Sequence, residues 1–229
     1  MHPYVRTNLL VAAACCAALC LVPSLGAQSA PTPTPSPSAI AKARADSLRY
    51  PYTVADVQFM TGMIGHHAQA IVMSKYAPTH GADPAVQRLA ERIINAQEDE
   101  IATMQRWLGD RLQPVPEAKP MAHDMAGMSG MAGMNHTSAI MAGMLTDAQM
   151  KALDAARGPE FDRLFLAGMI QHHRGATSMV STLFGTIGAG QDETIFKFAS
   201  DVNVDQTTEI ARMQRMLFEF ELKRTSAPD

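Results

Sequence analysis

Two histidine pairs, each preceded by a methionine at helical spacing, are the residues of this sequence best suited to chemistry. The pairs His66–His67 and His172–His173 follow matching Gly-Met-Ile segments, which place Met63 and Met169 four residues before the second histidine. On a helix, this spacing puts the thioether and the imidazole one turn apart on the same side. Thioether and imidazole form a soft ligand set that suits copper as Cu(I). We therefore interpret these residues as candidate metal ligands.

A second group of the same donors lies between residues 121 and 136. Methionines recur there at three-residue intervals among Gly, Ala and Ser. This composition cannot build a core, and exposed thioethers are open to oxidation without any gain in packing. Capture of a metal ion by a flexible loop explains the pattern better than a random linker does. The candidate ligands of this loop are Met121, His123, Met125, Met128, Met131, Met134 and His136.

The paired histidines also have a structural explanation. A buried polar group without a partner is unfavourable by roughly 2–7 kcal/mol, so histidines inside a helical bundle need either a metal or a hydrogen bond. In the structural explanation, His66 and His172 bond to glutamine or glutamate and fix the helix register, while the methionines fill the core. The paired histidines alone leave both explanations open, together with the binding of another metal.

Composition limits the chemistry further. All three cysteines precede residue 21, in a segment that we expect to be removed, so the mature chain offers no thiolate. The chain has 17 methionines and only 6% aromatic residues, so thioethers remain as the soft donors. With a net charge of −3 and no stripe of lysine or arginine, we expect no nucleic-acid partner.

The N-terminal segment is typical of a secretory signal peptide. Arg6 precedes an apolar run from Leu9 to Val22, which is shorter than the ~20 residues of a membrane-spanning helix. Small residues up to Ala27 indicate cleavage after that position, and a retained membrane anchor is the alternative. We expect a periplasmic or otherwise extracytoplasmic protein with no membrane span after cleavage.

The chain contains an internal repeat, which predicts a duplicated helix pair. The first copies share seven identities: Asp56, Phe59, Gly62, Met63, Ile64, His66 and His67 correspond to Asp162, Phe165, Gly168, Met169, Ile170, His172 and His173. Further along, Gln97, Glu100 and Met104 correspond to Gln206, Glu209 and Met213.

Capping residues and helix breakers outline the elements that position these side chains. Long helices are expected from Thr53 to about Ala77, Pro84 to about Leu108, Gly158 to about Phe184 and Gln191 to about Leu222, and short ones at 39–49 and 147–156. We divide the chain into a signal peptide (1–27), a Pro/Ser/Thr-rich spacer with a short helix (28–50), a first helix pair (51–109), the Met/His/Gly-rich loop (110–145), a second helix pair (146–222) and a tail (223–229). Two helix pairs predict an all-α, four-helix bundle.

Helical projection at about 100° per residue puts both histidines of each pair on the stripe facing the interior. Met60, Met63 and Met73 share the first stripe, whereas Thr61 and Ala68 are expected on the opposite side. The residues expected behind the ligands are Met60, Gln97, Glu100, Met104, Gln206, Glu209 and Met213.

The two His-His segments, at residues 59–73 and 161–176, resemble the domain of unknown function 305 family, and the likeness covers roughly Tyr52 to Leu222. The resemblance implies a ferritin-like helical bundle, bacterial export and, as in methionine-rich copper-binding members, periplasmic copper handling. The motif residues it implies are Met63, His66, His67, Met73, Met169, His172, His173 and Met179. The second copy departs from the first, with Leu166 in place of Met60 and Asn203 in place of Ile94.

We therefore expect an exported copper-binding protein that captures or buffers Cu(I), or confers resistance to it, and performs no catalysis. Its partners would be the metal ion and a copper-transfer protein. The alternatives are an envelope scaffold with structural histidines and a di-metal oxidoreductase. The second alternative is disfavoured because the sequence contains no Glu-x-x-His motif.

Replacing Met125, Met128, Met131 and Met134 by serine is expected to lower the Cu(I) stoichiometry and leave thermal unfolding unchanged, because a glycine-rich loop buries little surface. Thioethers do not titrate, so the wild type should keep its loop-bound Cu(I) at pH 5.0. The Cu(I) that the variant fails to bind should therefore equal the Cu(I) that the wild type still binds at pH 5.0. Anaerobic titration against a competing chelator measures both. Full stoichiometry in the variant would show that the loop is a linker.

Overall fold

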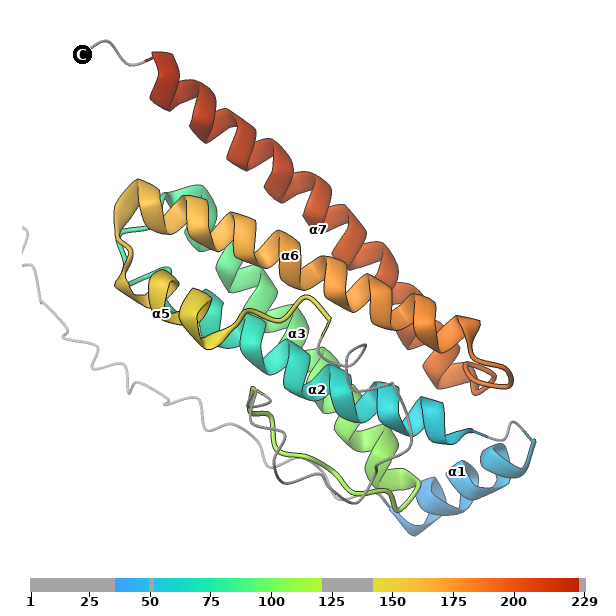
Figure 1. The fold of residues 1–229 in the computed structure, drawn as a ribbon. Coiled ribbons are helices and arrows are strands. Elements are labelled where there is room, and N and C mark those ends of the chain that lie inside the picture. The colour runs from blue at the N-terminus through green and yellow to red at the C-terminus, as the bar shows by residue number, and fades with distance from the viewer. Residues whose placement is uncertain (1–35, 50–51, 121–141, 227–229) are drawn as a thin grey trace, which may run out of the picture. The chain divides into compact units, whose positions relative to one another are not determined.

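The computed structural model describes residues 36–49, 52–120 and 142–226, so the expected loop ligands Met121 to His136 lie outside the described residues. Every element within these ranges is a helix, which confirms the all-α prediction (Figure 1). The helices are α1 (Pro37–Arg49), α2 (Val54–Lys75), α3 (Pro84–Asp110), α5 (Asp147–Ala155), α6 (Gly158–Gly185) and α7 (Glu193–Ser226). None of these helices has the length and apolar character needed to cross a membrane.

Local sequence explains where the long helices begin. Thr53 caps α2 in a capping box with Asp56, and Asp83 caps α3 with Pro84 in its first turn, as their positions predict. α7 begins at Glu193, two residues later than expected. Asp192 explains the shift, because its carboxylate accepts hydrogen bonds from the backbone N–H groups of the first turn of α7.

Two helix pairs, α2 with α3 and α6 with α7, pack against each other through α2 and α6. α2 contributes Phe59, Met60, Met63, Ile64 and Ile71 to one buried cluster and Ala70 and Met73 to a second cluster. α6 does the reverse, because residues 161–170 enter the second cluster and residues 176–183 enter the first. The two helices therefore cross in opposite directions, and both histidine pairs lie between the two apolar clusters.

The duplicated aspartates tie the two pairs together reciprocally. Asp56 accepts a hydrogen bond of 2.7 Å from the backbone N–H of Gly190, in the turn between α6 and α7. Asp162, its counterpart, accepts bonds of 3.1 and 3.2 Å from the backbone N–H of Asp83, in the turn between α2 and α3. Both carboxylates are buried. The aspartate of the repeat therefore holds the opposite pair's turn in place.

Helix α2 is buried on nearly every side, which corrects one expectation. Ala68 was expected to face away from the interior, but only 3% of its surface is exposed. The reason is that α2 packs against α3 and α6 and is also covered by residues 142–145, a segment that we call the strap.

The strap is bonded to both central helices. The Gln69 side chain donates to the Leu145 carbonyl at 2.9 Å and accepts from the Leu145 N–H at 2.7 Å. At the other end of the strap, Ala142 approaches α6 so closely that a Cβ on Gly175 would lie 1.9 Å from the Ala142 carbonyl oxygen. Glycine at position 175 is therefore required by the strap.

Gly175→Ala is expected to lower the free energy of unfolding by roughly 1–3 kcal/mol or more, because two backbones must separate to admit the methyl group. Gly185→Ala is the matched control on the same helix, because an added Cβ meets nothing within 4 Å there. We expect the control to change stability by less than about 1 kcal/mol. Equal urea midpoints for the two variants would contradict the described seating of the strap.

Candidate metal centre

The four repeated histidines meet at the junction between the helix pairs and are fully buried. His66, His67, His172 and His173 each have 0% of their surface exposed. The His66 and His172 rings lie face to face across the α2–α6 contact, with their centroids 3.7 Å apart and their planes tilted by 38°. The His67 ring lies farther out, with its centroid 6.3 Å from that of His66, and the His173 ring centroid is 6.2 Å from that of His172. The arrangement follows the internal repeat.

Each histidine directs its Nε2 atom at an oxygen acceptor. His66 Nε2 lies 3.1 Å from the carbonyl of Ala142 in the strap, and His172 Nε2 lies 2.9 Å from the carbonyl of His66. A carbonyl oxygen has no proton to donate, so the proton of each of these rings is on Nε2.

The outer two histidines direct Nε2 at carboxylates. Glu209 Oε2 lies 2.7 Å from His173 Nε2 in a hydrogen bond. Glu100 Oε2 lies 2.6 Å from His67 Nε2, as an ion-pair contact outside good hydrogen-bond geometry. A lone pair facing a carboxylate at these distances would be repelled, so Nε2 also carries the proton in these two rings.

The Nδ1 atoms of all four histidines are buried and have no hydrogen-bond partner among the described residues. Because Nε2 carries the proton, each Nδ1 presents a lone pair to the interior. Metal-bound histidines characteristically donate their other ring nitrogen to a carboxylate or a backbone carbonyl, which fixes the tautomer. His66, His172 and His173 have that arrangement, and His67 has a carboxylate oxygen 2.6 Å from its Nε2 atom without good hydrogen-bond geometry.

Burial keeps the rings of His66 and His172 neutral. Loss of solvation, with the nearby His67 as the next cause, lowers the pKa of His66 from 6.5 to about 3, although the bond to Ala142 opposes the shift. The pKa of His172 is also well below its usual value, because of burial first and then the proximity of His66. A neutral imidazole is the form that coordinates a metal ion.

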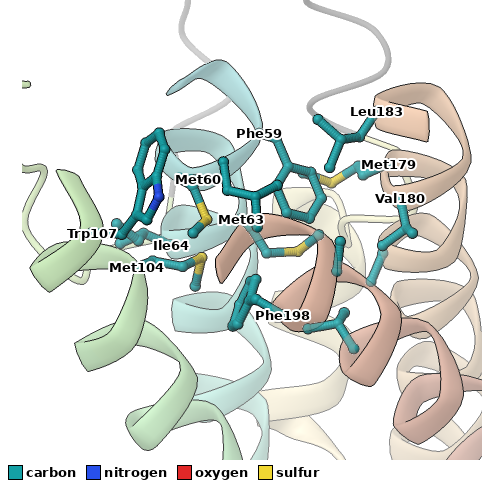
Figure 2. Close-up of a cluster of buried hydrophobic side chains, with 14 of the residues drawn as sticks. Phe59, Met60, Met63, Ile64, Met104, Trp107, Met179, Val180, Leu183 and Phe198 are labelled. Atoms are coloured by element: carbon teal, nitrogen blue, oxygen red, sulfur yellow. The ribbon is translucent and has the colours of Figure 1, made fainter. Parts of the chain in front are cut away.

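Thioethers gather on either side of the histidines in two clusters that correspond through the repeat. Met60, Met63, Met104 and Met179 belong to the first apolar cluster, and Figure 2 shows all four, with Met60 and Met104 on the side of Trp107. Met73, Met169 and Met213 belong to the second cluster, where Leu166 replaces the fourth methionine. We call these groups the first and second thioether clusters.

The helical projection did not predict that the methionines separate into two clusters. Met63 and Met73 share a stripe of α2, but ten residues of helix rise about 15 Å, so one ion cannot contact both. Each cluster instead combines methionines from both copies of the repeat, because α2 and α6 run in opposite directions. Met73 therefore lies with Met169, and Met179 lies with Met63.

The structural explanation of the histidines also needs correction. His66 and His172 do not bond to Gln97, Glu100, Gln206 or Glu209, because their Nε2 atoms are directed at backbone carbonyls. Glu100 and Glu209 contact the other two histidines. Gln97 and Gln206 are buried but retain side-chain atoms without a partner in the described part of the chain. Sequence gives no direct signal for the bonds to Ala142 and to the His66 carbonyl, since any residue supplies a carbonyl.

Within the described ranges, no group of three or more His, Cys, Asp or Glu side chains is arranged to hold a metal ion. The donors that meet in the bundle are imidazoles and thioethers. This set of donors is of the kind that suits a soft metal ion.

Comparisons with known proteins agree with this fold. The family model described as Domain of unknown function (DUF305) matches residues 56–217. Uncharacterized protein L153 of Acanthamoeba polyphaga mimivirus is 38% identical over 65 residues, which cover 28% of this chain and 43% of that protein. A DUF305 protein from Streptomyces coelicolor, described as a candidate secreted protein, is 29% identical with a TM-score of 0.59, covering 73% of this chain and 92% of that chain.

A further similar structure is CopM in a Cu(II)-bound form, which is 29% identical with a TM-score of 0.54 and covers 72% of this chain and 97% of that chain. CopM has also been solved in Cu(I)-bound, Ag-bound and apo forms. Identity at this level over most of the bundle relates this chain to a protein that binds copper and silver.

The metal-free protein is expected to lose stability as the pH falls below 6.5. Above pH 6.5, His66 and His172 are neutral in both the folded and the unfolded protein. Below pH 6.5, these histidines become protonated in the unfolded chain but stay neutral in the folded protein until the pH reaches their lowered pKa values. The loss is up to about 1.4 kcal/mol per pH unit for each histidine. Urea unfolding of wild type and His172→Gln at pH 7.5, 6.0 and 5.0 measures it. The variant should have the shallower dependence, and parallel curves would contradict the buried neutral state.

Proposed function

This chain belongs to the DUF305 family, and on that premise we propose that it binds copper as Cu(I) through methionine and histidine, in a compartment outside the cytoplasm. The carrying observation is that all four buried histidines have Nε2 directed at an oxygen acceptor and Nδ1 unpartnered within the described structure. A group of buried lone pairs without donors is unfavourable for a purely structural site and suitable for a metal ion.

The ligand set would combine imidazole Nδ1 atoms with thioethers of the two clusters. Met63 precedes His67 by one turn, and Met169 precedes His173 by one turn, so each outer histidine has a thioether beside it on its own helix. Thioethers have no proton to lose, and the inner rings of His66 and His172 are already neutral because burial lowers their pKa values.

Glu100 and Glu209 would act as positioning residues. Each carboxylate lies within 2.7 Å of the Nε2 atom of an outer histidine, Glu209 in a hydrogen bond and Glu100 in an ion-pair contact, and so would keep the proton on Nε2 and leave Nδ1 free to coordinate. Their negative charges also compensate a monovalent cation in an otherwise apolar interior, which lowers the unfavourable free energy of burying the charge. The two glutamates occupy matching positions of the repeat, so both outer histidines receive the same support.

The biological role would be capture, buffering or resistance, without catalysis. Similarity to CopM, with its Cu(I)-bound and Ag-bound structures, supports a soft monovalent ion as the cargo. The similar Streptomyces protein, described as a candidate secreted protein, supports an extracytoplasmic location, as does the N-terminal pattern of this sequence. A copper-transfer protein would then receive or supply the ion.

An envelope scaffold with structural histidines is the competing function. A scaffold gains nothing from leaving four buried Nδ1 atoms without partners, since each desolvated acceptor is unfavourable by about 1–3 kcal/mol. The two functions separate in one test, because a scaffold binds no metal at the histidines and is unaffected when thioethers are replaced by isosteric apolar side chains.

Combined Met63→Leu and Met169→Leu substitutions are expected to raise the Kd of the bundle for Cu(I) by roughly tenfold or more, equivalent to about 1.4 kcal/mol. The swap conserves volume, so stability should fall by less than about 1.5 kcal/mol. Anaerobic chelator competition, together with the fluorescence of Trp107 beside the first thioether cluster, measures binding in the bundle.

Met150→Leu on α5 is the matched control, because Met150 is half-buried and packs against the second apolar cluster without belonging to either thioether cluster. It should bind Cu(I) as the wild type does. Equal Cu(I) affinity for the double variant and this control, or uptake of Zn(II) in equal competition with Cu(I), would contradict the proposed function.

A further inference from the structure

A groove between α3 and α7 leads from the surface toward the buried histidines. It encloses a cavity of about 230 Å³. Its polar wall comes from matching positions of the repeat, with Gln97 and Glu100 on α3 and Gln206 and Glu209 on α7. Asp205 adds a third carboxylate, and Arg92 and Arg212 also line the groove.

Two wall residues connect the groove with the metal centre. The Glu100 side chain is 19% exposed and contacts His67, whose side chain is 0% exposed. The Glu209 side chain is 22% exposed and contacts His173, which is also fully buried. Each glutamate therefore has access to solvent in the groove and to an imidazole in the interior. A swing of either side chain would join the two.

Unpartnered amides line the same groove. Gln97 is 2% exposed and has neither its oxygen nor its nitrogen bonded to a described residue, and the side-chain oxygen of Gln206, 3% exposed, is likewise unbonded. Buried amide oxygens without donors are available to a cation. Three carboxylates and two arginines line the groove, and burial first, then the charges of Glu100, Asp201 and Glu209, raise the pKa of the Asp205 carboxyl.

The α2–α6 side of the histidines is covered. The strap lies there, with its Ala142 carbonyl on His66 and its Leu145 backbone bonded to Gln69. The contact between the strap and Gly175 is too close to admit even a methyl group. An ion moving to the imidazoles along that side would have to displace backbone.

We propose that the metal ion enters the bundle through the α3–α7 groove, with Glu100 and Glu209 as its first ligands. The inference rests on the proposed function. Carboxylate and amide oxygens hold Cu(I) more weakly than imidazole and thioether do, so the ion moves inward toward tighter ligands. Each glutamate then returns to the Nε2 proton of its histidine, and no bond is made or broken in the protein.

Ala96→Phe tests the route without touching a ligand, because Ala96 lines the groove and is exposed. Stopped-flow fluorescence of Trp107, the one tryptophan of the chain, follows anaerobic Cu(I) as it fills the first thioether cluster in the full-length protein. We expect the loading rate to fall by roughly tenfold and the final amplitude to match the wild type. Asn95→Phe, at an exposed neighbouring position of α3 outside the groove wall, is the control and should load at the wild-type rate.

A charge reversal gives a second measurement that does not depend on filling the groove. Asp205→Lys should slow loading by about threefold or more at low salt, through lost attraction of the cation. Glu98→Lys, a reversal on α3 outside the groove, should leave the rate unchanged. Wild-type rates in both Ala96→Phe and Asp205→Lys would overturn the route. Absence of any Trp107 response and of Cu(I) uptake in the wild type would instead overturn the proposed function.

Discussion

Burial of four histidine side chains between two helix pairs is the constraint on which the rest of the structure depends. Each buried ring needs an oxygen acceptor near one nitrogen, and the fold supplies those acceptors from four different places. The carbonyl of Ala142, the carbonyl of His66 and the carboxylates of Glu100 and Glu209 each receive one Nε2. The strap, the central α2–α6 contact and the outer helices are therefore all fixed relative to the histidines.

Duplication supplies most of this arrangement, and its departures from symmetry are equally informative. The reciprocal aspartate contacts and the outer His–Glu contacts occur in both halves, and the two thioether clusters correspond to each other through the repeat. Symmetry fails at the centre, where His172 bonds to the carbonyl of His66 but His66 bonds to the strap. It fails again at Leu166, which gives the second cluster one thioether fewer. The two halves are therefore expected to differ in affinity for a soft ion.

Local signals in the sequence predicted the helices and the inward direction of the histidines, because caps and helical periodicity act over a few residues. Thr53 and Pro84 start α2 and α3 where expected, and all four histidines are buried. The separation of Met63 from Met73 was not predicted, since it depends on the opposite directions of α2 and α6. The bonds of His66 and His172 could not be predicted either, because their acceptors are carbonyls and not side chains.

The tautomer of the four histidines is the most direct test of the metal-centre account. Long-range 1H–15N correlation spectra of the imidazole rings distinguish a protonated from an unprotonated nitrogen, before and after addition of Ag(I) as a redox-inert substitute for Cu(I). The account predicts protonated Nε2 at His66, His67, His172 and His173 in both samples, with Nδ1 resonances that shift when the ion binds. Protonated Nδ1 in the metal-free protein, or Nδ1 resonances that do not respond to Ag(I), would contradict it.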